Sequence, residues 1–191
     1  MSNRNPLKVV TGVVRGSYVS VLEPKDFGDG QDPKYSMALL IPKSDNATLR
    51  KIKAAQKAAL EAKKNIFKGG KIPANWKDTL RDGDNDASID TDENPEYADH
   101  YFMNVSSKSK PGVVDRDLNP ILDASEIYSG AYYRVAMTAF AFNNNGNQGV
   151  SFALNNVQKV KDGEPFGGVN AKAEDDFDDD FEFGTDDDDL I

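Results

Sequence analysis

The chain has 191 residues, no cysteine and a formal net charge of −9. This length suffices for one domain with appendages, and the absence of cysteine excludes disulfides, thiolate zinc sites and cysteine nucleophiles. Because no stretch approaches the roughly 18 apolar residues of a membrane span and the N-terminus has no apolar block, we expect a cytoplasmic protein with no membrane partner.

The negative charge is concentrated at the C-terminal end. Residues 173–191 hold 11 of the 32 acidic residues and none of the 23 basic ones. Residues 1–172 therefore carry 23 basic against 21 acidic residues, a net charge of +2. This asymmetry predicts a partner-binding domain over residues 1–172 and a disordered acidic interaction tail over residues 173–191.

Two strands are expected near the N-terminus. Apolar and polar residues alternate over residues 7–21, which predicts one long strand that bends at Gly12 and Gly16. A turn-rich segment follows, and the next apolar run, residues 35–41, predicts a second strand that ends before a proline.

One helix is expected after the second strand. Ser44 or Asp45 can cap a helix over residues 47–66, and Gly69 and Gly70 would end it. Its apolar face consists largely of alanine and is narrow. We therefore expect the helix to pack against a sheet rather than to form the core of a bundle.

The remaining strands complete a barrel. Strands are predicted over residues 100–106, 131–142 and 149–157, the last two joined by a hairpin, whereas residues 113–123 form at most a short hairpin. Five strands with glycine-marked bends predict a mostly β, antiparallel barrel. The five-stranded OB-fold is the small barrel that most often binds single-stranded nucleic acid. Because the helix follows the second strand rather than the third, it would be an insertion into that fold.

The strand over residues 131–142 has two different faces. One face is suited to the core and consists of Tyr133, Val135, Met137, Ala139 and Ala141. The other face mixes rings, a hydroxyl and a cation, and consists of Tyr132, Arg134, Thr138, Phe140 and Phe142. Aromatic rings beside a cation suit base stacking with phosphate neutralisation. The alternative is that these rings pack under the helix or a loop.

Basic residues outside this strand are candidates for phosphate contacts. The segment KKNIFKGGKIPANWK, residues 63–77, combines lysines with two rings, and a second basic turn follows the third strand. The candidates are Lys68, Lys71, Lys77, Lys108 and Lys110. Trp76 is either a stacking platform or a core residue, and the segment as a whole is otherwise a solvated helix end.

Catalysis and metal binding are not expected. The segment DGDNDASIDTDE, residues 82–93, resembles a calcium loop in its acidic spacing, but Ala87 replaces the required glycine and Pro95 follows. We therefore expect a solvated acidic loop without metal. His100 is the single histidine, and no nucleophile elbow or phosphate-binding loop is present. A two-metal nuclease would need carboxylates at strand ends. We expect no enzyme and no cofactor.

The C-terminal half resembles a known family. The run EIYSGAYYRVAMTAFAFNNNGNQGVSFALNNVQKVKDGEPFGG, residues 126–168, is similar to tailed-phage single-stranded DNA-binding proteins. These proteins share its Tyr-Ser-Gly opening, aromatic strand, Asn/Gly hairpin and closing DGEP, in this order. YSMALLIPKSD (35–45), YADHYFMNVSS (97–107) and KPGVVDRD (110–117) also resemble that family.

The resemblance implies an OB-fold body that binds single-stranded DNA without sequence preference, an acidic tail, and a role in phage DNA replication and recombination inside the host cell. We expect DNA to cross the face of Arg134, Phe140 and Phe142. The runner-up is an acidic-tailed adaptor or chaperone that does not bind DNA. The sequence specifies neither the oligomeric state nor a preference between DNA and RNA.

The tail itself resembles the expected ligand, because rings are spaced along a polyanion. We predict that it competes with DNA for the binding surface and recruits replication or recombination proteins when DNA binds; the alternative is a purely solubilising tail. The residues expected to contact partners are Phe177, Phe181, Phe183, Asp186, Asp187, Asp188, Asp189, Leu190 and Ile191. Bacterial single-strand binding proteins end in acidic residues and Pro-Phe, so this different ending is consistent with a phage-encoded partner.

Overall fold

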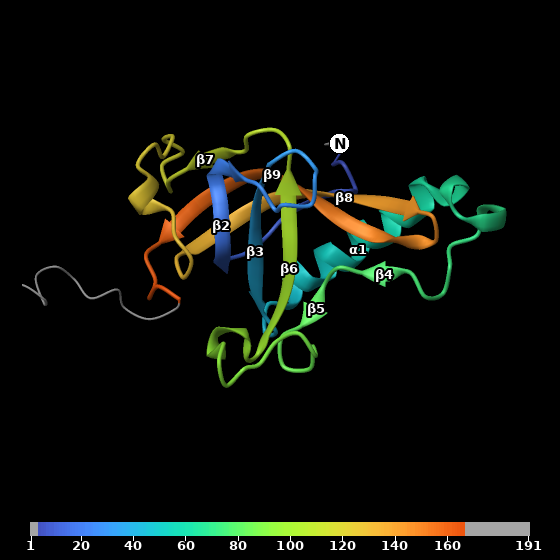
Figure 1. Ribbon diagram of the computed structural model, residues 1–191, viewed down its shortest axis with the longest axis horizontal. Coiled ribbons are helices and arrows are strands. Elements are labelled where there is room, and N and C mark those ends of the chain that lie inside the picture. Colours follow the sequence, from blue (N-terminus) through green and yellow to red (C-terminus); the bar gives the residue numbers. More distant parts are fainter. Residues whose placement is uncertain (1–3, 167–191) are drawn as a thin grey trace, which may run out of the picture.

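The computed structural model describes residues 4–166, which are mostly β with one α-helix (Figure 1). The strands are β1 (Lys8–Val10), β2 (Val14–Lys25), β3 (Lys34–Pro42), β4 (Lys77–Asp78), β5 (Arg81–Asp82), β6 (His100–Ser107), β7 (Gly112–Val114), β8 (Tyr132–Asn144) and β9 (Asn147–Lys161). The helical segments are α1 (Asn46–Ala62) and the 3₁₀ turns η1 (Lys64–Ile66), η2 (Lys68–Gly70), η3 (Pro95–Tyr97) and η4 (Ala124–Glu126). Within the described residues, no helix has the length and apolarity needed to cross a bilayer.

Five of the strands form a closed ring. β2 pairs with β3, β3 with β6, β6 with β9, β9 with β8, and β8 with β2 again. All of these pairings are antiparallel except β6–β9, which is parallel and involves the single pair Ser106 and Ala153. A five-stranded Greek-key barrel of this kind is the OB-fold. The predicted mostly β barrel is therefore confirmed.

The barrel interior follows the alternation seen in the sequence. Tyr133, Val135, Met137 and Ala139 are buried, as predicted for the inner face of β8. Helix α1 packs against β1, β8 and β9, and adds Ile52, Ala55, Ala59 and Leu60 to the core. The helix thus packs against the sheet, as expected. In chain order it comes after the second barrel strand, β3, and before the third, β6, which is also as expected.

The prediction of one strand over residues 7–21 is wrong, because the chain breaks into β1 and β2 where it crosses the start of α1. The Gly12 N–H donates to Thr48 Oγ1 at 2.8 Å instead of to a neighbouring strand. A Cβ at Gly12 would lie 2.7 Å from Asp45 Oδ2, so only glycine permits this close approach. Asp45 is the cap of α1, because its side chain accepts a hydrogen bond from the Thr48 N–H.

Helix α1 ends four residues before the predicted end at Ile66. Two 3₁₀ turns follow, and they direct the Phe67 side chain into the core, where it is 3% exposed. The carbonyl of Ile66 accepts a hydrogen bond from the Asn143 side chain at 2.8 Å, which joins this turn to the β8–β9 hairpin. The free energy gained by burying the Phe67 ring therefore outweighs that of continuing α1 to Ile66, which the sequence pattern favours.

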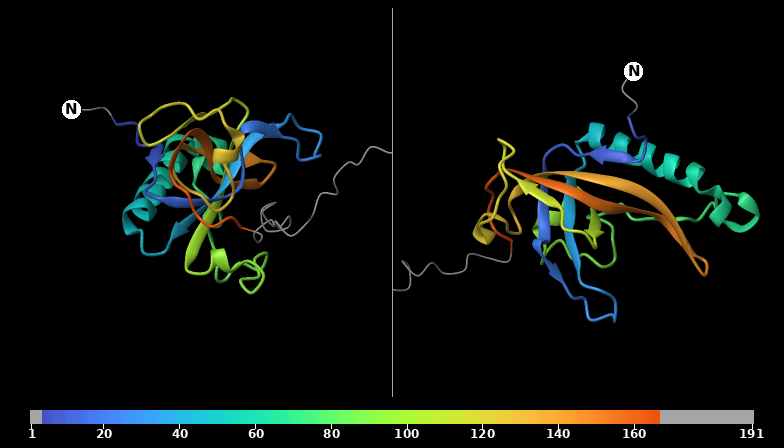
Figure 2. Two further views of the ribbon diagram at one scale, coloured as in Figure 1. Left: turned by 90° about the vertical axis from the view of Figure 1, so that its left-hand side faces the viewer. Right: turned by 90° about the horizontal axis from the view of Figure 1, so that it is seen from above.

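Strands β8 and β9 form a long hairpin that extends past the barrel (Figure 2). Its turn is Asn145-Gly146, and both residues have positive φ angles, 52° and 89°, as a two-residue type I′ turn requires. The extended part, residues 140–151, is called the arm below. β4 pairs with the arm at Gly149, where an added Cβ would lie 2.2 Å from the Lys77 carbonyl oxygen.

Candidate nucleic-acid interface

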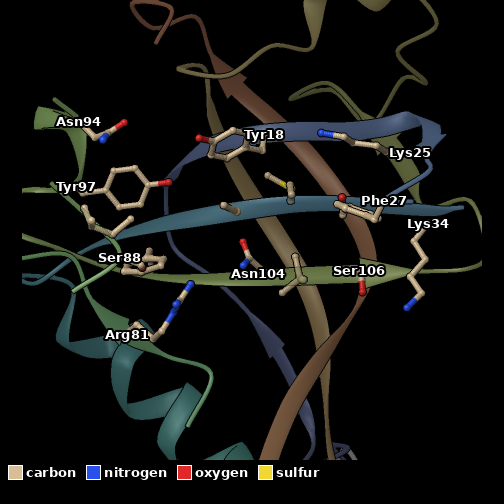
Figure 3. A pocket seen from close by; sticks show the side chains of 16 residues that line it. Tyr18, Lys25, Phe27, Lys34, Arg81, Ser88, Asn94, Tyr97, Asn104 and Ser106 are labelled. Carbon is tan, nitrogen blue, oxygen red and sulfur yellow. The ribbon is translucent and has the colours of Figure 1, made fainter. Parts of the chain in front are cut away.

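A groove of about 490 Å³ lies on the outer face of β2, β3 and β6 (Figure 3). Its floor consists of small side chains that are paired across the strands, Ser36 with Ser106 and Ala38 with Asn104. Side chains from β2, the β2–β3 loop, β5 and the segment before β6 form its walls. In OB-folds, the face of the second and third barrel strands, here β3 and β6, is where oligonucleotides bind.

Tyr18 reaches over the groove because of a bulge in β2. The pairing of β2 with β3 shifts between Ser17 and Ser20, and Tyr18 has a φ angle of +47°. A bulky residue seldom adopts this backbone conformation, and a bulge is a common means of redirecting a side chain. The side chain is 70% exposed, so this strained position holds an aromatic ring out in solvent beside the groove.

The β2–β3 loop supplies a second ring, and the ends of the two strands that flank it supply two cations. Phe27 is 54% exposed, and the Lys25 Nζ lies 5.6 Å from the centroid of its ring. Lys34 lines the same end of the groove (Figure 3). An exposed ring beside ammonium groups can stack on a base while the cations neutralise adjacent phosphates.

Arg81 forms the opposite end of the groove. Its guanidinium carbon lies 4.4 Å from the centroid of Phe102, which is buried, and Tyr97 meets Phe102 edge to face at 5.2 Å. Burial raises the pKa of Tyr97. An arginine supported in this way presents a flat cationic surface, and such planes stack on unpaired bases.

The acidic loop between β5 and β6 is attached to the barrel by Lys43. The Lys43 Nζ lies 2.6 Å from Asp82 Oδ1 and 2.6 Å from Asp84 Oδ2. This ammonium holds the pKa of Asp82 at about 2, and the two carboxylates raise the pKa of Lys43. Two of the carboxylates that match the calcium-loop spacing therefore bind a side chain of the protein. The attachment positions the loop, whose Ser88 and Asn94 line the groove.

The described chain ends beside this groove. Phe166 packs against the small apolar cluster of Leu40, Tyr97 and Phe102, and the last two of these residues line the groove. Arg15 fixes it there, because the guanidinium carbon lies 4.4 Å from the Phe166 ring centroid. The same guanidinium donates to the Glu164 carbonyl at 2.8 Å. The predicted partner-binding residues Phe177 to Ile191, and the predicted boundary at residue 172, lie outside the described residues.

Three of the predicted DNA-binding residues lie on the outer face of β8 near or on the arm. Thr138 donates a hydrogen bond to Asn155, Phe140 is 46% exposed and Phe142 is half-buried. Ser106 pairs with Ala153, which in turn pairs with Thr138. Paired residues share a face of a sheet. The groove floor and the outer face of β8 are therefore parts of one continuous surface.

The other two predicted residues of β8 lie toward its opposite end. The Arg134 guanidinium donates to the Thr11 carbonyl at 3.3 Å, although the side chain is exposed. Tyr132 lies between two cations, with Arg15 at 5.1 Å and Lys161 at 4.6 Å from its centroid. The structure therefore does not place Arg134 and Tyr132 with the arm residues, and the roles of all five side chains stay predictions.

The candidate lysines separate into two groups. Lys68 and Lys71 are exposed after α1, and Lys77 pairs with Gly149 of the arm, the residue that also pairs with Phe142. Lys108 lies 3.9 Å from Asp32 of the β2–β3 loop, and Lys110 is exposed nearby in sequence. The group of Lys68, Lys71 and Lys77 thus belongs to the segment that pairs with the arm. The group of Lys108 and Lys110 lies near the β2–β3 loop at the groove. Trp76 is half-buried and packs against the main core.

Sequence reasoning missed most residues that line the groove. Tyr18, Phe27, Arg81, Lys25 and Lys34 come from four separate segments, and no strand pattern unites them. One usable signal was present: Phe27 is a large ring in a loop rich in glycine and aspartate, where no core requires it. Tyr18 gave no such signal, because its exposure depends on the bulge.

An OB barrel with exposed rings and cations on this face defines a class of proteins that bind single-stranded nucleic acid. Comparison with known families agrees with this classification. The chain belongs to the family of the Enterobacter phage Enc34 single-stranded DNA-binding protein, which matches residues 7–191. The predicted resemblance to phage single-stranded DNA-binding proteins is confirmed. The proteins of this family are binding proteins rather than enzymes.

One curated protein and two solved structures illustrate what the chain is similar to. The putative protein p50 of Acyrthosiphon pisum secondary endosymbiont phage 1 is 32% identical over 179 residues, which cover 91% of this chain and 94% of that protein. The bacteriophage Enc34 single-stranded DNA-binding protein in complex with ssDNA has a TM-score of 0.69 and 28% identity, over 84% of this chain and 90% of that one. Bacteriophage T7 gp2.5, a single-stranded DNA-binding protein, shares the fold with a TM-score of 0.58 at 15% identity, over 92% and 97% of the two chains.

Proposed function

We propose that this protein binds single-stranded DNA without sequence preference during phage DNA replication and recombination, in the cytoplasm of the host cell. The observation that carries the proposal is the groove on β2, β3 and β6, which combines exposed rings with cations on the oligonucleotide-binding face of an OB barrel. Family membership and the relative in complex with ssDNA support it.

In this proposal, bases stack on Tyr18, Phe27 and the plane of the Arg81 guanidinium. The charges of Lys25, Lys34 and Arg81 each neutralise one phosphate. Residues 1–172 carry a net charge of only +2, so stacking has to supply much of the affinity. Each stacked base contributes about 1–3 kcal/mol. Thr138 and the arm residues Phe140 and Phe142, with the lysines beside the arm, extend the same surface and remain candidates for a longer binding path.

The test is fluorescence anisotropy with labelled oligo(dT) and with a matched duplex, each at two salt concentrations. Tyr18→Ala and Phe27→Ala should each weaken binding to oligo(dT) by about 1–3 kcal/mol. Phe140→Ala and Arg134→Ala test the arm and the β8 face in the same way. Leu122→Ala is the matched control, because its side chain is 88% exposed on the β7–η4 connection, away from the groove.

The outcomes separate the candidate surfaces. If only Tyr18→Ala and Phe27→Ala weaken binding, DNA occupies the groove. If Phe140→Ala or Arg134→Ala also weakens binding, DNA contacts β8 as well as the groove. Normal binding by all four variants would place the interface elsewhere. No binding of the unmodified protein at low salt would refute the function and favour the acidic-tailed adaptor. Degradation of the oligonucleotide with added magnesium would instead indicate a nuclease.

We also propose that the acidic tail, residues 173–191, competes with DNA and recruits replication or recombination proteins. Support comes from the charge of the tail and from Phe166, the last described residue, which packs against the cluster that contains the groove residues Tyr97 and Phe102. Deleting residues 173–191 should then raise the affinity for oligo(dT), most strongly at low salt, where electrostatic competition is strongest. Unchanged affinity would leave only the recruiting role.

A further inference from the structure

Asn104 lies in the middle of the groove floor with its amide free. Figure 3 shows it on β6, between the Arg81 and Tyr97 end of the groove and the Phe27 end. The side chain is exposed, and among residues 4–166 its amide has no hydrogen-bond partner. Its cross-strand neighbour is Ala38, whose other neighbour is Ser17. Small side chains therefore lie across the strands from the amide and leave space for the edge of a base.

A primary amide presents one acceptor, Oδ1, next to one donor, Nδ2–H. The Watson–Crick edge of every DNA base also presents a donor next to an acceptor: N6–H and N1 in adenine, N4–H and N3 in cytosine, N1–H and O6 in guanine, and N3–H and O4 in thymine. The order of donor and acceptor differs between bases. Rotation about the Cβ–Cγ bond of asparagine reverses the order of the amide, and this terminal torsion has broad minima. One asparagine can therefore pair with all four bases.

We propose that Asn104 pairs with the Watson–Crick edge of whichever base occupies the groove floor, and that this adaptable pairing makes binding tolerant of sequence. The proposal rests on the proposed function, because it requires unpaired bases in the groove. Single-stranded nucleic acids expose these edges, whereas a duplex hides them. A fixed donor or a fixed acceptor at the same position would instead select particular bases.

The substitution Asn104→Leu keeps the size of the side chain and removes both hydrogen-bonding atoms. It should weaken binding roughly three- to tenfold, which corresponds to the loss of a hydrogen-bonded pair, and by a similar factor for oligo(dA), oligo(dC) and oligo(dT). Asn46→Leu is the matched control, since Asn46 is exposed at the start of α1. Because both side chains are exposed, thermal melts should be unchanged.

Asn104→Asp tests whether the position can be made selective for one base. A carboxylate only accepts hydrogen bonds, and guanine is the base that presents two adjacent donors, N1–H and N2–H. Thymine presents one donor between two carbonyl oxygens, which repel the carboxylate. The variant should therefore prefer a repeat of dG and dT over oligo(dT) by about tenfold, whereas the unmodified protein should not.

A chemically altered ligand tests the contact directly. Thymine methylated at N3 has lost the donor of its Watson–Crick edge but keeps its stacking face. The unmodified protein should bind an oligonucleotide of this base as weakly as Asn104→Leu binds oligo(dT), and methylation should not weaken the variant further. If the unmodified protein binds oligo(dT) but Asn104→Leu binds it equally well, or if Asn104→Asp shows no preference for guanine, the inference is wrong and the proposed function stands. If the unmodified protein does not bind single strands, the proposed function itself fails.

Discussion

The salt dependence of DNA binding can be derived from the groove. Three cations line it, Lys25, Lys34 and Arg81. On single strands the logarithm of the binding constant falls with the logarithm of salt concentration by about 0.7 for each neutralised phosphate. Three contacts therefore predict a slope of about −2, so that raising the salt from about 50 to about 200 mM should weaken binding about 20-fold.

Single substitutions separate the charge contribution from the stacking contribution. Lys34→Gln should make the slope shallower by about 0.7, because one phosphate contact is lost. Phe27→Ala should weaken binding by about 1–3 kcal/mol at a fixed salt concentration and leave the slope unchanged, because a stacked ring releases no counterion. Lys57→Gln is the control, since Lys57 is exposed on α1 outside the groove.

The assay is a titration of labelled oligo(dT) by anisotropy at four or more salt concentrations. A slope near zero would contradict the assignment of phosphates to these three cations. An equal change of slope with Lys57→Gln and Lys34→Gln would show that the net charge of the protein, rather than the groove, determines the salt dependence. A slope much steeper than about −2 would indicate that the lysines beside the arm also bind phosphates.

Two further predictions concern stability. Tyr133 is fully buried, its hydroxyl accepts from the Tyr128 N–H at 3.0 Å and donates to the Tyr128 carbonyl at 2.8 Å, and burial raises its pKa to about 12. Tyr133→Phe should therefore lower the free energy of unfolding in urea by about 1–3 kcal/mol, because two backbone groups lose their partner; an unchanged midpoint would show that water replaces the hydroxyl. Lys43 holds the pKa of Asp82 at about 2, below the ordinary value of an aspartate, so its contribution to stability should be complete above about pH 4 and be lost as the pH falls toward about 2. Urea unfolding should show that the free energy of unfolding falls less between about pH 4 and about pH 2 for Lys43→Met than for the unmodified protein. Equal decreases would contradict the role of this contact.

The sequence was informative where a local pattern is enough. In β8 the alternation of side chains predicted which residues are buried, because a strand with one face on a core repeats every two residues. The Asn-Gly pair predicted the hairpin turn because few residues tolerate two consecutive positive φ angles. The interruption of the first strand at Gly12 was not predictable in this way, since it depends on contacts with Asp45 and Thr48 in another element.

The candidate site was harder to predict for the same physical reason. Arg81 reaches the groove because it packs on Phe102, and Tyr18 does so because of an extra residue in the pairing of two strands. Both are tertiary effects with no local sequence signature. The aromatic residues of β8 had such a signature, because they alternate with buried residues along one strand, and Phe140 and Phe142 were therefore predictable where the groove residues were not.

The outer edge of β9 is shared among three separate segments. β4 pairs with it at two positions, β6 at the single pair Ser106 and Ala153, and β7 at three positions. A fifteen-residue strand with one edge left open would be a template for pairing with another chain, and this division covers the edge in the described structure. The groove floor is therefore joined to β9 by a single residue pair, while β4 and β7 cover other parts of the same edge.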